Sequence, residues 1–320
     1  LGVFSHADHF LTNSRASLND LVAVGEKLGH QVDSSRTQVI PLDADFRKTA
    51  ATQPARTYLD DQGLKPESYV LFVSTIESRK NHIALFKAWG RLIDRHGVEQ
   101  MPVLVCVGNR GWLNDQVFKR LDTDPVLGSR VRMLRGVADA DLAALYRHCA
   151  FSVYPSLYEG WGLPVTEALT YGKPVLVSRI SSLPEAAGEF GTYFDVHDAD
   201  DLDAKLETLI FDIEARQQIA DRIARDYRPR PWSDLARQIL GTITAWNETV
   251  KETAVVSPPI QPGRYYWLQR SLRTHIDADT VAAEIFRSGD GWEAPEDWGC
   301  WTLDGDATLT PQEADILSEA

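Results

Sequence analysis

The residues best suited to chemistry are concentrated in one segment, YPSLYEGWGLPVTEALTYGKPVLVS at 154–178. Pro164 stands where the first turn of a helix belongs, after a short apolar strand and a loop. We expect the backbone N–H groups of residues 162–165 to point outward there, where the helix dipole favours negative charge. Gly160 and Gly162 would let a ligand approach the backbone closely. The segment therefore predicts an anion site suited to a diphosphate.

Two carboxylates accompany this predicted site. Glu159 lies in the loop before the helix, and we place Glu167 on the first turn of the helix. They should reach different parts of one ligand, because carboxylates accept hydrogen bonds from the vicinal hydroxyls of a sugar or a ribose. A purely structural alternative stays open, in which Glu159 is a solvated loop residue and Glu167 only complements the helix dipole.

A second segment, STIESRKNH at 74–82, places two cations after an apolar strand. Arg79 and Lys80 follow the strand YVLFVS at 69–74, on the same predicted rim as the 159–164 loop. Two cations facing a helix N-terminus could hold a diphosphate and stabilise it as it leaves. The alternative is an exposed charge pair before a helix, but the shared rim favours a functional role.

The elements that must position these residues alternate between strand and helix. Strands are predicted at 69–74, 102–108, 131–134, 151–156, 174–178 and 192–196. Helices are predicted near 81–96, 113–121, 139–149, 164–171, 184–187 and 200–212. Continuous apolar strands separated by helices indicate an α/β, Rossmann-like, doubly wound parallel sheet. Ligands bind at the carboxyl ends of such strands.

Taken together, these segments resemble the retaining, GT-B-fold glycosyltransferases of family 4. The resemblance rests on the E-x7-E spacing in EGWGLPVTE, on YPSLYEG before it, ALTYGKPV after it and TIESRKN upstream. It covers about residues 8–250 and is strongest to the bacterial mannosyltransferase-like enzymes of surface polysaccharide assembly.

The resemblance implies a role for each matching residue. Glu159 would contact the hydroxyls of the donor sugar, and Arg79 with Lys80 would contact the diphosphate, which makes these three the catalytic candidates. Further donor contacts would come from Glu167 to the ribose, from the backbone at Gly160, Gly162 and Leu163, and from Val137 near the base. One departure is Thr75, which stands where many members carry an arginine. Arg79 is the expected substitute.

The implied reaction transfers a sugar with retention from a nucleotide diphosphate sugar, with GDP-mannose favoured. The acceptor would be a hydroxyl of a saccharide or of a lipid-linked acceptor. Neither a metal nor another cofactor is implied, and a front-face route is favoured over a covalent intermediate on Glu159. Two alternatives stay open: an inactive nucleotide-sugar-binding fragment, and a GT-B-fold nucleotide-sugar epimerase.

Composition narrows the other possibilities. The 320 residues are 43% hydrophobic and 25% charged, as in soluble globular proteins. Residues 274–320 hold 12 acidic residues and one base, which is −11 of the net charge of −13, so the remainder has no strongly basic surface for nucleic acid. Three scattered cysteines fit a reducing compartment. We expect a cytoplasmic protein, with peripheral association with the inner face of the membrane left open.

The predicted organisation has four parts. Residues 1–55 are read as the remnant of an N-terminal, acceptor-side Rossmann-like domain, with strands at 10–13 and 37–42 and a helix capped by Ser14. Residues 66–228 are predicted to form the donor-binding domain, and residues 229–250 a closing helix. Residues 251–320 are predicted to be a linker followed by an acidic, Trp-rich extension. Residues 47–66 are read as a polar connection. Because the chain begins at Leu1, we expect an N-terminally truncated protein.

Two further signals are set aside. The tripeptide Asp-Ala-Asp could suggest a metal site, but Asp139 and Asp198 are interpreted as helix caps or turn residues. It occurs at 43–45, 139–141, 198–200 and 277–279. The tryptophans of the extension could form a carbohydrate-binding module, but the core of a small truncated domain is the favoured interpretation. They are Trp292, Trp298 and Trp301.

Overall fold

The computed structural model describes residues 3–4, 7–45 and 55–249, together with four two-residue strands. These strands are β9 (Tyr266–Trp267), β10 (Val281–Ala282), β11 (Arg287–Ser288) and β12 (Thr308–Leu309). Residues 8–26 and 31–244 form one compact unit. The three tryptophans of the predicted extension and the tripeptide at 277–279 lie outside the described residues. Within the described residues, no helix combines the length and apolarity needed to span a bilayer.

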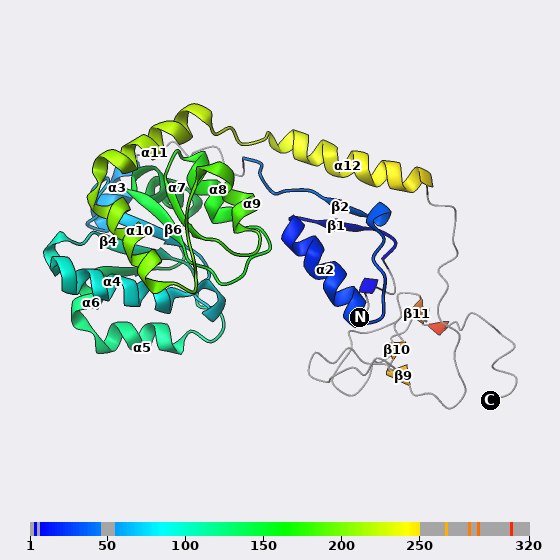
Figure 1. Ribbon diagram of the computed structural model, residues 1–320, viewed down its shortest axis with the longest axis horizontal. Helices are drawn as coiled ribbons and strands as arrows, with labels where there is room; N and C mark the ends of the chain where they lie inside the picture. Colours follow the sequence, from blue (N-terminus) through cyan, green and yellow to red (C-terminus); the bar gives the residue numbers. More distant parts are fainter. Residues whose placement is uncertain are drawn as a thin grey trace, which may run out of the picture. The chain divides into compact units, whose positions relative to one another are not determined.

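The central element is a six-stranded sheet in the order β5-β4-β3-β6-β7-β8. Figure 1 shows this sheet, with β4 and β6 labelled, among the surrounding helices. Its strands are β3 (Tyr69–Val73), β4 (Val103–Val107), β5 (Val131–Leu134), β6 (Phe151–Tyr154), β7 (Val175–Ser178) and β8 (Gly191–Phe194). All neighbouring strands are parallel. The predicted doubly wound, Rossmann-like sheet is confirmed. The strand order changes direction between β3 and β6, and a crevice forms at the carboxyl ends of strands at such a switch point.

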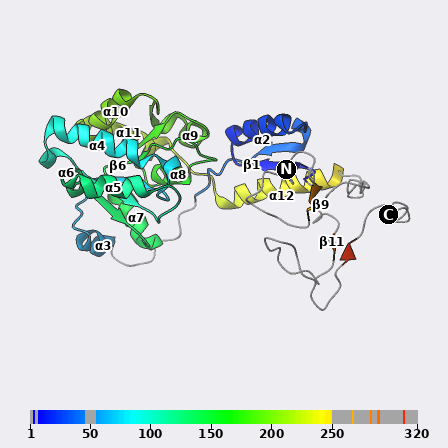
Figure 2. The ribbon, with the colours of Figure 1, turned by 90° about the horizontal axis from the view of Figure 1, so that it is seen from below.

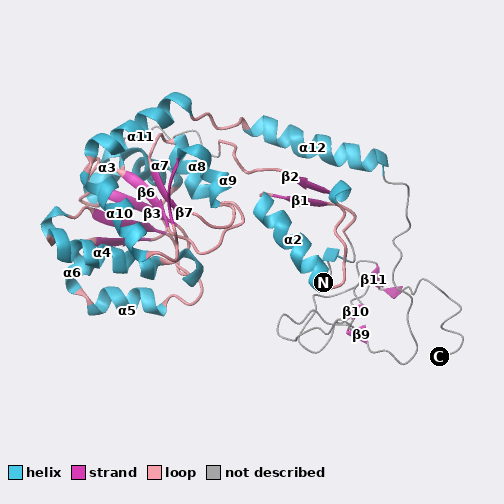
Figure 3. Cartoon of the chain, in the orientation of Figure 1, coloured by secondary structure: helices cyan, strands magenta, loops and turns pink. Residues whose placement is uncertain are grey.

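Helices flank this sheet, and most of them lie where the sequence places them (Figure 3). They are α4 (His82–His96), α5 (Asp115–Thr123), α6 (Pro125–Ser129), α7 (Asp139–His148), α8 (Leu163–Thr170), α9 (Leu183–Ala187), α10 (Ala199–Phe211) and α11 (Ile213–Asp226). The sequence pattern misses α11, because Ile223 is its only buried residue. It also misses α3 (Ala55–Asp61), which lies in the predicted connection and buries Leu59.

The segment before the sheet contains a smaller parallel pair, β1 (Phe10–Thr12) and β2 (Thr37–Val39), joined by α2 (Arg15–Lys27) (Figure 2). The predicted cap is confirmed, because the N–H of Ser17 donates to Ser14 Oγ at 2.9 Å. Helix α12 (Trp232–Thr249) follows the last helix of the sheet unit. Its Leu235 is buried in a small apolar cluster with Ile40 and Ala44. The predicted domain limits stay predictions.

Candidate active site

Two loops meet at the switch point of the sheet. The loop after β3 continues through the short 3-10 helix η2 (Ser78–Lys80), and the loop after β6 carries Glu159. The N–H of Leu157 donates to the carbonyl of Arg79 at 2.8 Å. Asn81 Nδ2 donates to the carbonyl of Pro155 at 3.1 Å. These bonds fix the loop that carries the cations against the loop that carries the carboxylate.

The predicted cations and the predicted carboxylate form one ion cluster. Lys80 Nζ lies 2.6 Å from Glu159 Oε1, and Arg79 Nη1 lies 2.7 Å from Glu159 Oε2. Arg79 also pairs with Glu77 at 2.6 Å. Lys80 is 7% exposed and Glu159 is 6% exposed. The alternative interpretations of Glu159 as a solvated loop residue and of Lys80 as an exposed cation are therefore wrong. The Arg79 side chain is partly exposed to solvent.

The burial and the pairing act in opposite directions on these groups. Burial alone would raise the pKa of Glu159, but the hydrogen bond and charge of Lys80, with help from Arg79, bring it below its ordinary value of 4.5. Burial lowers the pKa of Lys80, and Glu159 offsets part of this effect. The carboxylate is thus held ionised between two cations, and such a cluster of shifted pKa values marks a candidate functional site.

Helix α8 begins directly after this cluster, one residue earlier than predicted. Gly162 is its N-cap with φ 105°, and Leu163 is the first helical residue. Of the amides expected at 162–165, Pro164 has no N–H, and the N–H of Val165 donates to the carbonyl of Gly162. No described residue accepts from the N–H groups of Gly162 and Leu163. The amides available to an anion are therefore fewer than the sequence suggested.

The position of Glu167 differs from the prediction in the same way. Because α8 starts at Leu163, Glu167 lies on its second turn, and the first turn contains no acidic residue. Tyr146 Oη donates to Glu167 Oε2 at 2.8 Å. Burial raises the pKa of Glu167, the bond from Tyr146 lowers it, and the charge of Asp139 raises it again. The interpretation of Glu167 as an acid on the first turn is therefore wrong. Glu167 is instead a second-turn residue whose carboxylate is held by Tyr146.

Two serines after β7 hold the Glu159 loop, and no sequence motif points to them. The N–H of Glu159 donates to Ser181 Oγ at 2.9 Å, and Ser182 Oγ donates to the carbonyl of Glu159 at 2.9 Å. Ser181 has φ 47°, which is rare for a residue other than glycine. Only their position in the sequence could have pointed to these serines. They follow β7, the neighbour of β6, so they lie on the same rim of the sheet as the Glu159 loop.

The remaining predicted donor contacts are placed as follows. The carbonyl of Gly160 accepts from Ser17 Oγ of α2 at 3.3 Å. Val137 lies between β5 and α7, partly buried, and is not part of the ion cluster. Since β5 and β3 are parallel and separated by β4, Val137 lies on the same rim, two strands from Arg79 and Lys80. Its role near a base stays a prediction.

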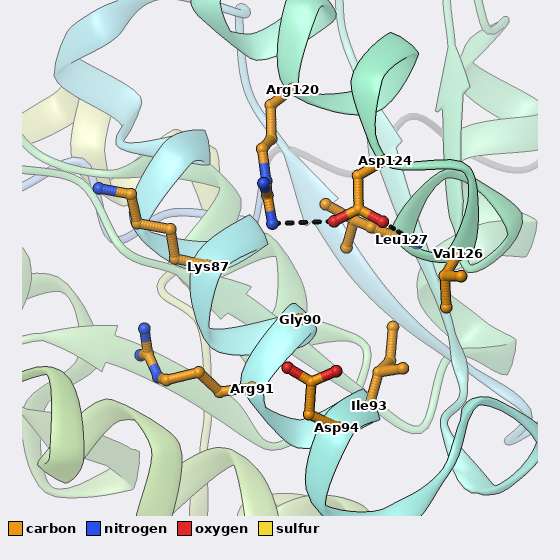
Figure 4. A pocket seen from close by; sticks show the side chains of 9 residues that line it. All are labelled: Lys87, Gly90, Arg91, Ile93, Asp94, Arg120, Asp124, Val126 and Leu127. Carbon is orange, nitrogen blue, oxygen red and sulfur yellow. Dashed lines mark hydrogen bonds and ion pairs between the residues drawn. The ribbon is translucent and has the colours of Figure 1, made fainter.

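A separate cavity of about 370 Å³ lies among α4, α5 and α6 (Figure 4). Its two arginines are already paired. Arg120 Nη2 lies 2.9 Å from Asp124 Oδ2, and Arg91 makes two bonds, of 2.7 and 2.6 Å, to Asp203. None of the predicted site residues lines this cavity. The switch-point cluster is therefore the stronger candidate for the active site.

Comparison with known proteins gives a consistent result. The family model Glycosyl transferases group 1 matches residues 57–226, which is more than half of the chain. O-antigen chain mannosyltransferase B of Escherichia coli is 33% identical over 174 residues, covering 54% of this chain and 45% of that protein. Serotype-specific mannosyltransferase WbdA of Escherichia coli is 27% identical over 235 residues, covering 73% of this chain and 28% of that protein. The chain thus spans less than half the length of these two curated relatives.

Solved structures agree on the fold. Anabaena Alr3699/HepE in complex with UDP-glucose superposes with a TM-score of 0.61 at 20% identity, covering 76% of this chain and 65% of that one. Sucrose-phosphate synthase from Thermosynechococcus elongatus gives 0.60 at 20% identity, covering 78% and 61%. These likenesses show a GT-B, Rossmann-like fold. With the family model matched across the whole six-stranded sheet, the chain belongs to the glycosyl transferases of group 1.

Proposed function

We propose that this chain is the donor-binding part of a retaining glycosyltransferase. It would transfer a sugar from a nucleotide diphosphate sugar to a hydroxyl of a saccharide or lipid-linked acceptor in surface polysaccharide assembly. The similarity to O-antigen chain mannosyltransferase B supports mannose as the sugar. GDP-mannose is the donor that we propose.

One observation carries this proposal: two cations and a buried carboxylate converge at the switch point. Arg79 and Lys80 lie within 2.7 Å of the carboxylate oxygens of Glu159. Three residues further on, Gly162 caps α8 and offers an N–H without a partner among the described residues. Cations beside a helix N-terminus suit a diphosphate, and a carboxylate beside them suits sugar hydroxyls.

The chemistry follows from this arrangement. The bond between the anomeric carbon and the diphosphate oxygen breaks while the acceptor oxygen bonds to the same face of the sugar. The acceptor proton goes to the departing diphosphate, so no separate base is needed. Arg79 and Lys80 stabilise the charge that develops on the diphosphate, and Glu159 orients the sugar through its hydroxyls.

A thermal-shift panel with GDP, UDP and ADP sugars tests the donor assignment. We expect GDP-mannose to raise the melting temperature more than the other donors, because a ligand that binds only the folded state stabilises it. No shift with any donor would contradict the proposal. Incubation with GDP-mannose and a mannoside acceptor then tests transfer, with NMR of the product reporting retention. Donor binding without transfer would instead support a nucleotide-sugar-binding module.

A further inference from the structure

A buried tyrosine, to which the sequence analysis assigns no role, also belongs to the ion cluster. Tyr154 is the last residue of β6 and is only 2% exposed. Lys80 Nζ donates to Tyr154 Oη at 2.7 Å and to Glu159 Oε1 at 2.6 Å. The Lys80 ammonium is therefore held between the tyrosine hydroxyl and the carboxylate.

Tyr154 also reaches the start of α8. A Cβ placed on Gly162 would lie 3.9 Å from Tyr154 Cε1, so the tyrosine ring packs beneath the N-cap of the helix. On its other side the ring meets Phe72 edge-on, with centroids 6.0 Å apart and an interplanar angle of 86°. The ring is therefore fixed between the sheet and the helix N-terminus, and its hydroxyl has a fixed position.

The hydrogen bonds of Lys80 show how the Tyr154 hydroxyl orients the ammonium group. An ammonium group has three N–H donors, and here two of them go to Tyr154 and Glu159. The direction of the third is then fixed by the other two. If Glu159 turns to the sugar when a diphosphate binds, Tyr154 remains as the hydrogen-bond partner of Lys80.

From this geometry, and resting on the proposed function, we propose that Tyr154 is a positioning residue of the donor site. It holds the Lys80 ammonium at the place where the diphosphate of the donor binds. Tyr154 acts through Lys80 rather than by touching the reacting atoms. Arg79 does not depend on it, because Arg79 is held by Glu77 and by the carbonyl of Tyr158.

The variant Tyr154→Phe tests the proposal with GDP, UDP and ADP as probes in isothermal titration. Phenylalanine keeps the ring and its contact with Phe72, and only the hydroxyl is lost. For the nucleotide that wild type binds, we expect the dissociation constant to be about tenfold higher in Tyr154→Phe. Loss of a hydrogen bond to a charged group has an effect of this size. In a Lys80→Ala background the same change should have an effect below about twofold, because interacting residues are not additive.

Tyr69→Phe is the matched control. Tyr69 is also buried, and its hydroxyl donates to the carbonyl of Leu145 at 2.7 Å, at the opposite end of β3 from the ion cluster. We expect the two variants to lose similar melting temperature, while only Tyr154→Phe loses nucleotide affinity. Equal affinity in wild type and Tyr154→Phe, or an undiminished loss in the Lys80→Ala background, would overturn the role of Tyr154 alone. If wild type binds none of the three nucleotides, the proposed function itself fails.

Discussion

Lys80 Nζ and Glu159 Oε1 are 2.6 Å apart, so the carboxylate predicted to bind the donor sugar is paired with a cation predicted to bind the donor diphosphate. Glu159 also pairs with Arg79 at 2.7 Å. In this state the Glu159 carboxylate pairs with both cations that the proposed diphosphate would use. Under the proposed function, a diphosphate therefore competes with Glu159 for Arg79 and Lys80, and its displacement would free the carboxylate to meet the sugar.

The first prediction follows from this competition. In Glu159→Gln the two cations lose their anionic partner, so GDP without a sugar should bind more tightly, by about three- to tenfold. Sugar transfer should fall by much more, because the amide orients the sugar less well. Isothermal titration of GDP and a transfer assay measure the two effects.

Glu207→Gln is the control for this prediction, because it makes the same change in net charge at a surface pair with Arg95 and should leave GDP affinity unchanged. Weaker GDP binding by Glu159→Gln would show that Glu159 does not compete with the diphosphate.

The shared rim of Lys80 and Glu159 could be predicted from sequence, because both residues follow parallel strands and the carboxyl ends of parallel strands share one edge. Their burial and their ion pair could not be predicted in this way. The far end of α8 has a local signal in the sequence, because glycine is common just after a helix. Gly172 has φ 71°, and its N–H donates to the carbonyl of Leu169 at 2.9 Å.

The start of α8 could not be placed to the residue. It depends on the positive φ of Gly162, a residue that lies against Leu183, the first residue of α9. The shift of one residue moved Glu167 from the first turn to the second. Ser181 and Ser182 were missed for a related reason: they act through side-chain bonds to the backbone of the Glu159 loop, and such tertiary bonds leave no local pattern.

The second prediction concerns the pH dependence of nucleotide binding. Burial raises the pKa of Glu167, and the bond from Tyr146 lowers it. If ionised Glu167 accepts ribose hydroxyls, affinity falls as the pH falls through this raised pKa. Tyr146→Phe removes the lowering contribution, so the affinity of this variant should begin to fall at a higher pH than that of wild type. GDP titrations between pH 5 and 8 measure both profiles. Superimposable profiles for wild type and variant would refute the link between Tyr146 and Glu167.

The third prediction compares two glycines with positive φ. Gly136 has φ 61° and nothing within 4 Å of an added Cβ, so Gly136→Ala should lose only the about 1–2 kcal/mol that the left-handed conformation costs. Gly162 has φ 105°, and an added Cβ would lie 2.7 Å from Leu183 Cδ2, where Leu183 is fully buried. Gly162→Ala should therefore lose an additional ~1–3 kcal/mol through overpacking. Urea unfolding measures both values, and equal losses would contradict the close contact with Leu183.

The fourth prediction concerns His82, the first residue of α4. It is 1% exposed, its ring centroid lies 4.4 Å from that of Phe72, and its Nδ1 has no partner among the described residues. Burial, with a smaller effect from the charge of Lys80, lowers the pKa of His82 from 6.5 to about 4. Because the pKa in the folded state is below the unfolded value, its stabilising contribution is present above pH 6.5 and is lost as the pH falls toward 4.

This shift corresponds to about 3 kcal/mol, at 1.36 kcal/mol per pKa unit. His82→Phe removes the titration and keeps a ring between Phe72 and Phe86, so wild type should lose about 3 kcal/mol more than the variant between pH 7 and pH 4. Urea unfolding at each pH measures the difference. His96→Gln is the control, because His96 is half-buried and paired with Glu207, and this variant should retain the loss that His82 causes. Parallel stability curves for wild type and His82→Phe would show that His82 does not titrate in this range.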